Sequence, residues 1–190
     1  MNGGMRIALM MVTLAFPLRM LAQEPNLCTP KEEAIFTCTL ESRKIVSACA
    51  VLDGASEAPK SIAYRYGEKD AVELTIPHTT FPQDMRVSEI AAKPYSKVTE
   101  DDQYLRFIKG QYSYIIYTAD SYQFDLAGLA VFKGATLLKN ETCQSGNHPI
   151  QLSFNTLLSL GIQDDLDADK FWRSLLPKTS AVFTQPSEMQ

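Results

Sequence analysis

The chain has 190 residues with 18 basic and 22 acidic side chains, a formal net charge of −4, and 45% hydrophobic residues. This length is enough for one domain with a sizeable core and rarely enough for two. The basic residues are scattered without a run, which argues against nucleic acid or an anionic membrane surface as a partner.

The first 23 residues have the plan of a secretory signal peptide. Arg6 gives a basic start, Ile7 to Leu18 form a short apolar run, and Leu21-Ala22-Gln23 offers a processing point. The apolar run is shorter than the roughly 20 residues that span a bilayer. We therefore expect a periplasmic or secreted protein with no membrane insertion after cleavage, and an uncleaved anchor is the alternative.

The middle of the chain consists of β-branched and aromatic segments in pairs. Ile62, Tyr64 and Tyr66 alternate with Ala63 and Arg65, which is the two-residue period of a strand. Hairpins at such regular spacing predict a mainly β, antiparallel fold of about eight strands, either a barrel or two four-stranded sheets. The expected hairpins are Glu33–Leu40 with Lys44–Val51, Ser61–Gly67 with Ala71–Ile76, Tyr104–Lys109 with Tyr112–Thr118, and Gly128–Phe132 with Ala135–Asn140.

The stretch from Pro77 to Glu100 separates the second and third hairpins and holds three prolines. Prolines exclude a central strand, so we expect a long loop with one short helical turn near Arg86 to Ala92. Loops of this length in compact domains are often functional, and plain padding is the alternative.

The character of the chain changes after residue 143. A turn-rich linker precedes two expected short helices, Leu152–Leu160 and Ala168–Leu176, and the acidic residues from Asp164 to Asp167 offer N-caps for the second. The expected organisation is a signal peptide (1–23), a disulfide-stapled β domain (24–143), a helical appendage (144–178) and a disordered tail (179–190).

Four cysteines remain after export: Cys28, Cys38, Cys49 and Cys143. An even number in an oxidising compartment predicts two disulfides, with three connectivities to choose from. Cys38 and Cys49 flank the first hairpin turn, so we expect them to pair. Cys28 then meets Cys143 and closes a loop of about 115 residues. The rival pairing is Cys28–Cys38 with Cys49–Cys143, and free thiols are the third reading.

Catalytic signals are scarce. The two histidines, His78 and His148, each lie beside a proline in a predicted loop, and neither a G-x-S-x-G nor an H-E-x-x-H motif is present. We therefore predict no catalytic residue. A hydrolase that uses loop residues near His78 or His148 is the alternative.

One acidic cluster superficially matches the start of a calcium loop. Asp165, Asp167 and Asp169 have the right spacing, but Lys170 stands where such a loop needs glycine and Leu176 where it needs glutamate. We expect these acids to cap a helix, and we predict neither a metal nor a cofactor.

Tyrosines are concentrated on the predicted strands. Tyr112 and Tyr114 alternate with Ser113, so both should face one side of a sheet. Tyrosine combines apolar area with a polar tip and suits a binding surface. On strands such tyrosines more often pack half-buried across the sheet, and this is the favoured interpretation; Tyr64, Tyr66, Tyr112 and Tyr114 are the candidates for a binding surface.

Four segments resemble a family of small exported proteobacterial proteins that has no established activity. They are EAIFTCTLESRKIVSACA, IAYRYGEKDAVELTIP, YLRFIKGQYSYIIYTA and GLAVFKGATLLKNETC. The order C…YRYG…YLRF…G.Y.Y…C carries the resemblance, which covers Cys28 to Cys143. It implies a bacterial periplasmic or secreted protein and assigns no site residue. Where relatives carry glycines before the YLRF strand, this chain has the more acidic Val98–Asp102.

These observations favour a non-enzymatic binding protein of the bacterial periplasm. An inhibitor or immunity protein for an envelope-acting enzyme is the sharpest form of this prediction. The argument rests on the absent catalytic motifs and on analogy with small disulfide-stapled β domains. An acidic chain suits a basic protein partner in the cell envelope, such as a lysozyme-like enzyme. A structural envelope component is a further alternative.

Overall fold

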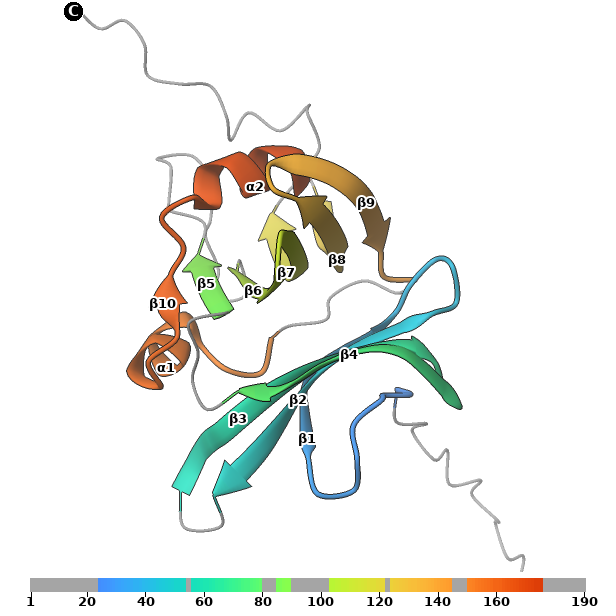
Figure 1. The fold of residues 1–190 in the computed structure, drawn as a ribbon, viewed down its shortest axis with the longest axis vertical. Coiled ribbons are helices and arrows are strands. Elements are labelled where there is room, and N and C mark those ends of the chain that lie inside the picture. The colour runs from blue at the N-terminus through green and yellow to red at the C-terminus, as the bar shows by residue number, and fades with distance from the viewer. Residues whose placement is uncertain are drawn as a thin grey trace, which may run out of the picture.

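The computed structural model describes residues 24–53, 56–79, 85–89, 103–121, 124–144 and 150–175. Over this part of the chain the protein is mainly β, with two sheets that pack face to face and two short helices (Figure 1). The predicted fold class is confirmed, and the arrangement is two sheets rather than a closed barrel. The predicted signal peptide, the tail from residue 179 and the acidic 98–102 segment lie outside the described residues.

The first sheet is an antiparallel meander in the order β1-β2-β3-β4. Its strands are β1 (Glu33–Thr39), β2 (Ile45–Asp53), β3 (Ser56–Glu68) and β4 (Ala71–Thr79). The first two predicted hairpins are therefore confirmed, although β3 and β4 are longer than expected.

The second sheet has six strands in the order β10-β5-β6-β7-β8-β9. Every neighbouring pair is antiparallel except β10 with β5. The third and fourth hairpins are confirmed, but the last turn is shifted by one residue, because Lys133 ends β8 and pairs with Thr136. The strands are β5 (Met85–Glu89), β6 (Gln103–Lys109), β7 (Tyr112–Ser121), β8 (Phe124–Lys133), β9 (Thr136–Thr142) and β10 (Gln163–Asp164).

The start of the predicted Pro77–Glu100 loop is instead strand. β4 continues through Pro77 to Thr79, and its pairing with β3 shifts between Ile62 and Tyr64, which marks a bulge. β4 is also an edge strand. Proline is tolerated at edges and bulges because a missing N–H breaks no ladder there.

The helical turn predicted near Arg86 to Ala92 is also wrong as far as Glu89, because Met85–Glu89 forms β5, and residues 90–92 lie outside the described residues. Met85 and Val87 are both buried and alternate along the strand, while β6 supplies the hydrogen-bonding partner. A five-residue strand shows too little alternation to be distinguished from a helical turn by pattern alone.

The helices α1 (Phe154–Ser159) and α2 (Ala168–Leu175) occupy the two segments predicted to be helical. Ser153 caps α1, since its hydroxyl accepts the N–H of Thr156 at 3.2 Å. Gly161, with φ 86°, follows the last helical turn, where a left-handed conformation commonly ends a helix.

The larger hydrophobic core fills the space between the two sheets, and α1 closes one side of it. A smaller cluster lies on the outer face of the second sheet beneath α2. The fold therefore has three layers: the four-stranded sheet, the six-stranded sheet and α2 (Figure 1). Burial of each large apolar side chain in these two clusters stabilises the folded protein by roughly 1.5–3 kcal/mol. The outer cluster contains Tyr104, Ile115, Tyr117, Phe132, Phe171 and Leu175.

All four cysteines form disulfides, Cys28–Cys49 and Cys38–Cys143. Two disulfides are thus confirmed, but the preferred Cys38–Cys49 pairing and its Cys28–Cys38 rival are both wrong. Cys38 lies in the core between the sheets, whereas Cys49 points to the outer face of β2. Side chains on opposite faces of a sheet point apart and cannot be bridged.

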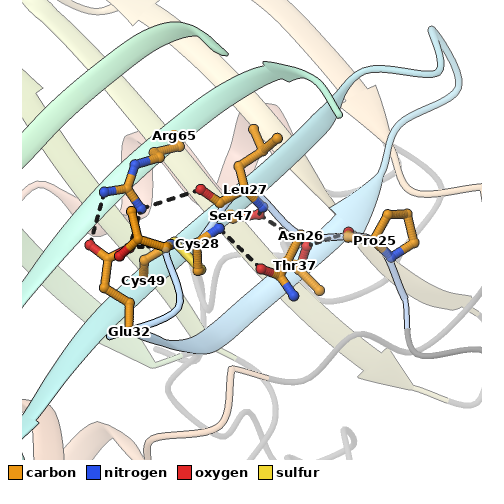
Figure 2. The surroundings of a disulfide bond; sticks show 10 residues. Pro25, Asn26, Leu27, Cys28, Glu32, Thr37, Ser47, Cys49 and Arg65 are labelled. Atoms are coloured by element: carbon orange, nitrogen blue, oxygen red, sulfur yellow. Dashed lines mark hydrogen bonds and ion pairs between the residues drawn. A yellow bond between two sulfur atoms is a disulfide. The ribbon is translucent and has the colours of Figure 1, made fainter. Parts of the chain in front are cut away.

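Residues 24–32 form a strap across that outer face (Figure 2). The disulfide fixes the strap to β2, and the Leu27 N–H donates to the Ser47 hydroxyl at 3.1 Å. Arg65 of β3 forms an ion pair with Glu32 through both guanidinium nitrogens, at 2.6 and 2.8 Å. The first described residues are therefore an integral part of the sheet's packing.

The two sheets are joined at one corner by the ends of β1 and β9. The Glu41 N–H donates to the Thr142 carbonyl at 3.1 Å, and the Gln144 N–H donates to the Thr39 carbonyl at 2.8 Å. The disulfide of Cys143 crosses at the same corner. The backbone hydrogen bonds and the disulfide therefore hold the two sheets together where β1 and β9 end.

Candidate binding surface

A row of cross-strand neighbours on the inner face of the second sheet runs from the core to solvent. Phe107 of β6 pairs with Tyr114 of β7. Val131 of β8 pairs with Tyr114 on one side and with Lys139 of β9 on the other. Phe107 is buried, Tyr114 and Val131 are partly exposed, and the Lys139 side chain is 40% exposed. The apolar core therefore reaches the surface along this row.

A second row lies two residues further along the same strands, next to the hairpin turns. Tyr112 pairs with Lys109 on β6 and with Lys133 on β8, and the Lys133 ammonium lies 5.9 Å from the Tyr112 ring centroid. Both lysines are exposed, and the tyrosine is partly exposed. A tyrosine flanked by two lysines thus forms the outer margin of the sheet.

The turns beside this second row are tied together. Gly110 and Gly134 have φ of 61° and 57°, as the first position of a two-residue hairpin turn requires. The Gly134 N–H donates to the Gln111 carbonyl at 2.9 Å, which links the two hairpin tips. The side chains of the second row are therefore presented by a well-supported backbone.

The first sheet contributes Tyr66 to the same area. The Lys139 ammonium donates to the Tyr66 hydroxyl at 3.1 Å, lies 5.3 Å from its ring centroid, and forms an ion pair with Glu141 at 3.0 Å. This contact connects β9 of the second sheet with β3 of the first sheet at the margin of the core. We define the tyrosine–lysine patch as Tyr66, Tyr112, Tyr114, Lys109, Lys133 and Lys139.

Tyr64 differs from the other three tyrosines of the predicted surface, because it is 1% exposed. Its ring centroid lies 5.4 Å from those of Phe107 and Tyr114, so it forms part of the base on which the patch rests. The structure therefore places Tyr66, Tyr112 and Tyr114 at the surface and Tyr64 in the core beneath them. Aromatic pairs at this spacing add about 0.5–1.5 kcal/mol to burial alone.

The electrostatic state of the patch follows from its surroundings. Burial, and then the neighbouring Tyr66 and Tyr114, raise the pKa of Tyr64 well above its usual value, and burial with Tyr112 nearby raises that of Tyr114. Partial burial of Lys139 lowers its pKa, but its hydrogen bonds to Tyr66 and Glu141 outweigh this, so the net shift is upward. Near neutral pH Tyr64 and Tyr114 are therefore neutral and Lys139 is charged.

Lys109, Lys133 and Lys139 were not among the side chains predicted to form the binding surface. The Gly110-Gln111 turn by itself predicts that Lys109 and Tyr112 are neighbours, so the first lysine was within reach of pattern reasoning. The bulge in β9 and the contact between Lys139 and Tyr66 involve a register shift and a pairing between sheets. Neither of these follows from local pattern.

A second group of charges is buried beneath α2. Asp165 accepts a hydrogen bond from the Tyr104 hydroxyl at 2.6 Å and lies 3.1 Å from Nε of Arg106. That N–H is not aligned for a hydrogen bond, so the Arg106 contact is an ion pair. The guanidinium also stacks 4.7 Å from the ring centroid of Phe171 on α2. This buried group attaches α2 to the sheet.

Two acids of the calcium-like motif, Asp165 and Asp167, are engaged in other contacts. Asp165 uses its second carboxylate oxygen to accept the Asp167 N–H at 3.2 Å, and Asp167 forms an ion pair with Lys170 at 3.0 Å. These contacts begin α2, as the capping prediction proposes. Among the described residues no group of three or more His, Cys, Asp or Glu side chains is placed to hold a metal ion.

The two histidines give no basis for a catalytic site. The backbone of His78 lies in β4 rather than in a loop, its side chain is outside what the structure describes, and His148 lies outside the described residues altogether. The hydrolase alternative therefore stays a hypothesis.

Comparisons with known proteins give no further assignment: no protein family, no curated protein and no solved structure matches this chain. Within the described ranges, no helix has the length and apolar character needed to cross a membrane. The two disulfides are typical of proteins in an oxidising compartment outside the cytoplasm.

Proposed function

We propose that this protein is an exported, non-enzymatic binding protein of the bacterial periplasm or exterior, and that the tyrosine–lysine patch contacts a protein partner. The observation that carries the proposal is the row from Phe107 to Lys139, in which the side chains pass from the buried core to the solvent-exposed surface and Tyr114 is partly exposed. Partly exposed tyrosines on a fixed backbone are the residues that dominate many protein interfaces.

The patch has the preorganisation that binding requires. Its tyrosines come from β3 and β7. The Lys139–Tyr66 hydrogen bond links the two sheets and fixes the position of Tyr66 relative to β9. Side chains that are already ordered lose little conformational entropy when a partner binds. The proposed partner is an envelope-acting enzyme, with this chain as its inhibitor or immunity protein.

Capture from an envelope extract tests the proposal. Immobilised mature protein should retain one stoichiometric partner, and Tyr112→Ala/Tyr114→Ala should lose it, because truncation of interface tyrosines commonly costs more than about 1 kcal/mol each. Leu166→Ala is the matched control, since Leu166 is an exposed apolar residue before α2 and outside the patch. Capture of nothing by the oxidised wild-type protein, or equal capture by all three proteins, would contradict the proposal.

A further inference from the structure

The outer margin of the patch carries positive charge that the described part of the protein does not neutralise. Lys109 and Lys133 stand on β6 and β8 with Tyr112 on the strand between them. Two interstrand spacings place their Cα atoms about 10 Å apart. Among the described residues neither lysine lies within ion-pair distance of a carboxylate.

The acid that contacts the patch is already engaged. Glu141 contacts Lys139 and accepts a hydrogen bond from Ser42. The positive charge at Lys109 and Lys133 is thus left for a ligand, although the chain as a whole is acidic.

We infer that the tyrosine–lysine patch takes an acidic peptide segment of a protein partner, with carboxylates opposite Lys109 and Lys133 and the chain of the segment lying over Tyr112 and Tyr114. This inference rests on the proposed function and assigns the chemistry of its partner. The tyrosines supply contact area, and the exposed lysines around them fix register and speed association.

An acidic protein segment fits this surface better than nucleic acid or an anionic membrane does. The unpaired charge is confined to two lysines beside tyrosines, whereas nucleic acid and anionic membranes need several phosphate contacts on a basic surface. A local basic margin on an acidic protein instead selects a partner that has an acidic segment at its contact site.

The test uses short poly-L-glutamate as the probe and the oxidised mature protein as the receptor. At low ionic strength, NMR titration should shift the signals of Lys109, Tyr112 and Lys133 most strongly, and the affinity should fall several-fold at 0.5 M salt because exposed charges are screened. Lys109→Glu/Lys133→Glu should weaken binding about tenfold or more. Lys31→Glu, on the strap of the other sheet, should leave it unchanged.

The outcomes separate this inference from the proposed function. Three results would overturn the inference that the patch binds an acidic segment: no binding of poly-L-glutamate, NMR signal shifts centred on other residues, or equal affinity after charge reversal. Binding to phosphatidylglycerol vesicles in place of poly-L-glutamate would overturn it in favour of a lipid surface. If Tyr112→Ala/Tyr114→Ala loses the envelope partner while Lys109→Gln/Lys133→Gln retains it, the binding function stands and the acidic segment is wrong.

Discussion

Tyr117 shows how one residue can determine its neighbour across a sheet. It pairs with Gly128, and its hydroxyl donates to Asn140 at 2.8 Å. A Cβ atom at position 128 would lie 2.8 Å from that hydroxyl and 2.3 Å from the Glu141 carbonyl, so only glycine fits. The ring of Tyr117 thus covers a glycine in the adjacent strand, an arrangement that compensates for the missing side chain.

The titration of Tyr117 gives a pH-dependent prediction. Burial, offset by the Asn140 hydrogen bond and reinforced by Glu41, raises its pKa to about 12. The unfolded chain loses this proton near pH 10, so the folded state holds it more tightly. The resulting stabilisation, roughly 2–3 kcal/mol, is complete below pH 10 and is lost as the pH rises towards 12.

Denaturant unfolding measured between pH 8 and pH 12 checks this prediction. The free energy of unfolding should fall more gently with pH in Tyr117→Phe than in the wild-type protein. Leu166→Ala, an exposed substitution that changes no titratable group, serves as the control and should follow the wild-type curve. Identical pH dependence in all three proteins would contradict the assignment.

At the level of elements, the hairpins were predictable because each uses local information. Alternation, the polar turns at residues 41–44 and 68–70, and the turns at Gly110 and Gly134 locate β1 to β4 and β6 to β9 from the sequence. Alternation also excludes the Cys38–Cys49 pairing that was predicted. In a hairpin that pairs Cys38 with Val46, Cys49 lies three residues further along β2 and must point to the opposite face from Cys38. β5 and β10 were not predictable, because each is short and is defined by its partner strand.

The candidate surface was only partly predictable for a related reason. Alternation shows that Tyr64 and Tyr66 share a face, but burial of one and exposure of the other depends on how far the second sheet extends above them. That distance is set by packing between sheets, which leaves no local signal in the sequence.

The attachment of α2 leads to a prediction for the buried charges. Asp165→Asn should remove the charge that compensates Arg106 and destabilise the protein by about 3–5 kcal/mol. Asp167→Asn is the matched control: it makes the same Asp-to-Asn change at an exposed site and should alter the free energy of unfolding little. Urea unfolding with hydrogen exchange of the α2 amides measures both. Equal stability of the two variants would show that the Asp165 contact does not hold α2.

At the scale of the whole molecule, the two disulfides act at different ranges. Cys28–Cys49 spans 21 residues and fixes the strap, whereas Cys38–Cys143 spans 105 and joins the two sheets. On the chain-entropy model they contribute about 3 and about 5 kcal/mol. The longer disulfide lies beside the hydrogen bonds between the ends of β1 and β9, so covalent and hydrogen bonds together hold the two sheets at this corner.

We propose that the tyrosine–lysine patch is the surface that binds the partner. Acetylation of lysines followed by mass spectrometry, with and without the captured envelope partner, measures this directly. Lys109 and Lys133 should be modified several-fold more slowly in the complex, while Lys31 on the strap and Lys170 on α2 keep their rates. Equal modification of Lys109 and Lys133 in the free and bound protein would contradict the claim.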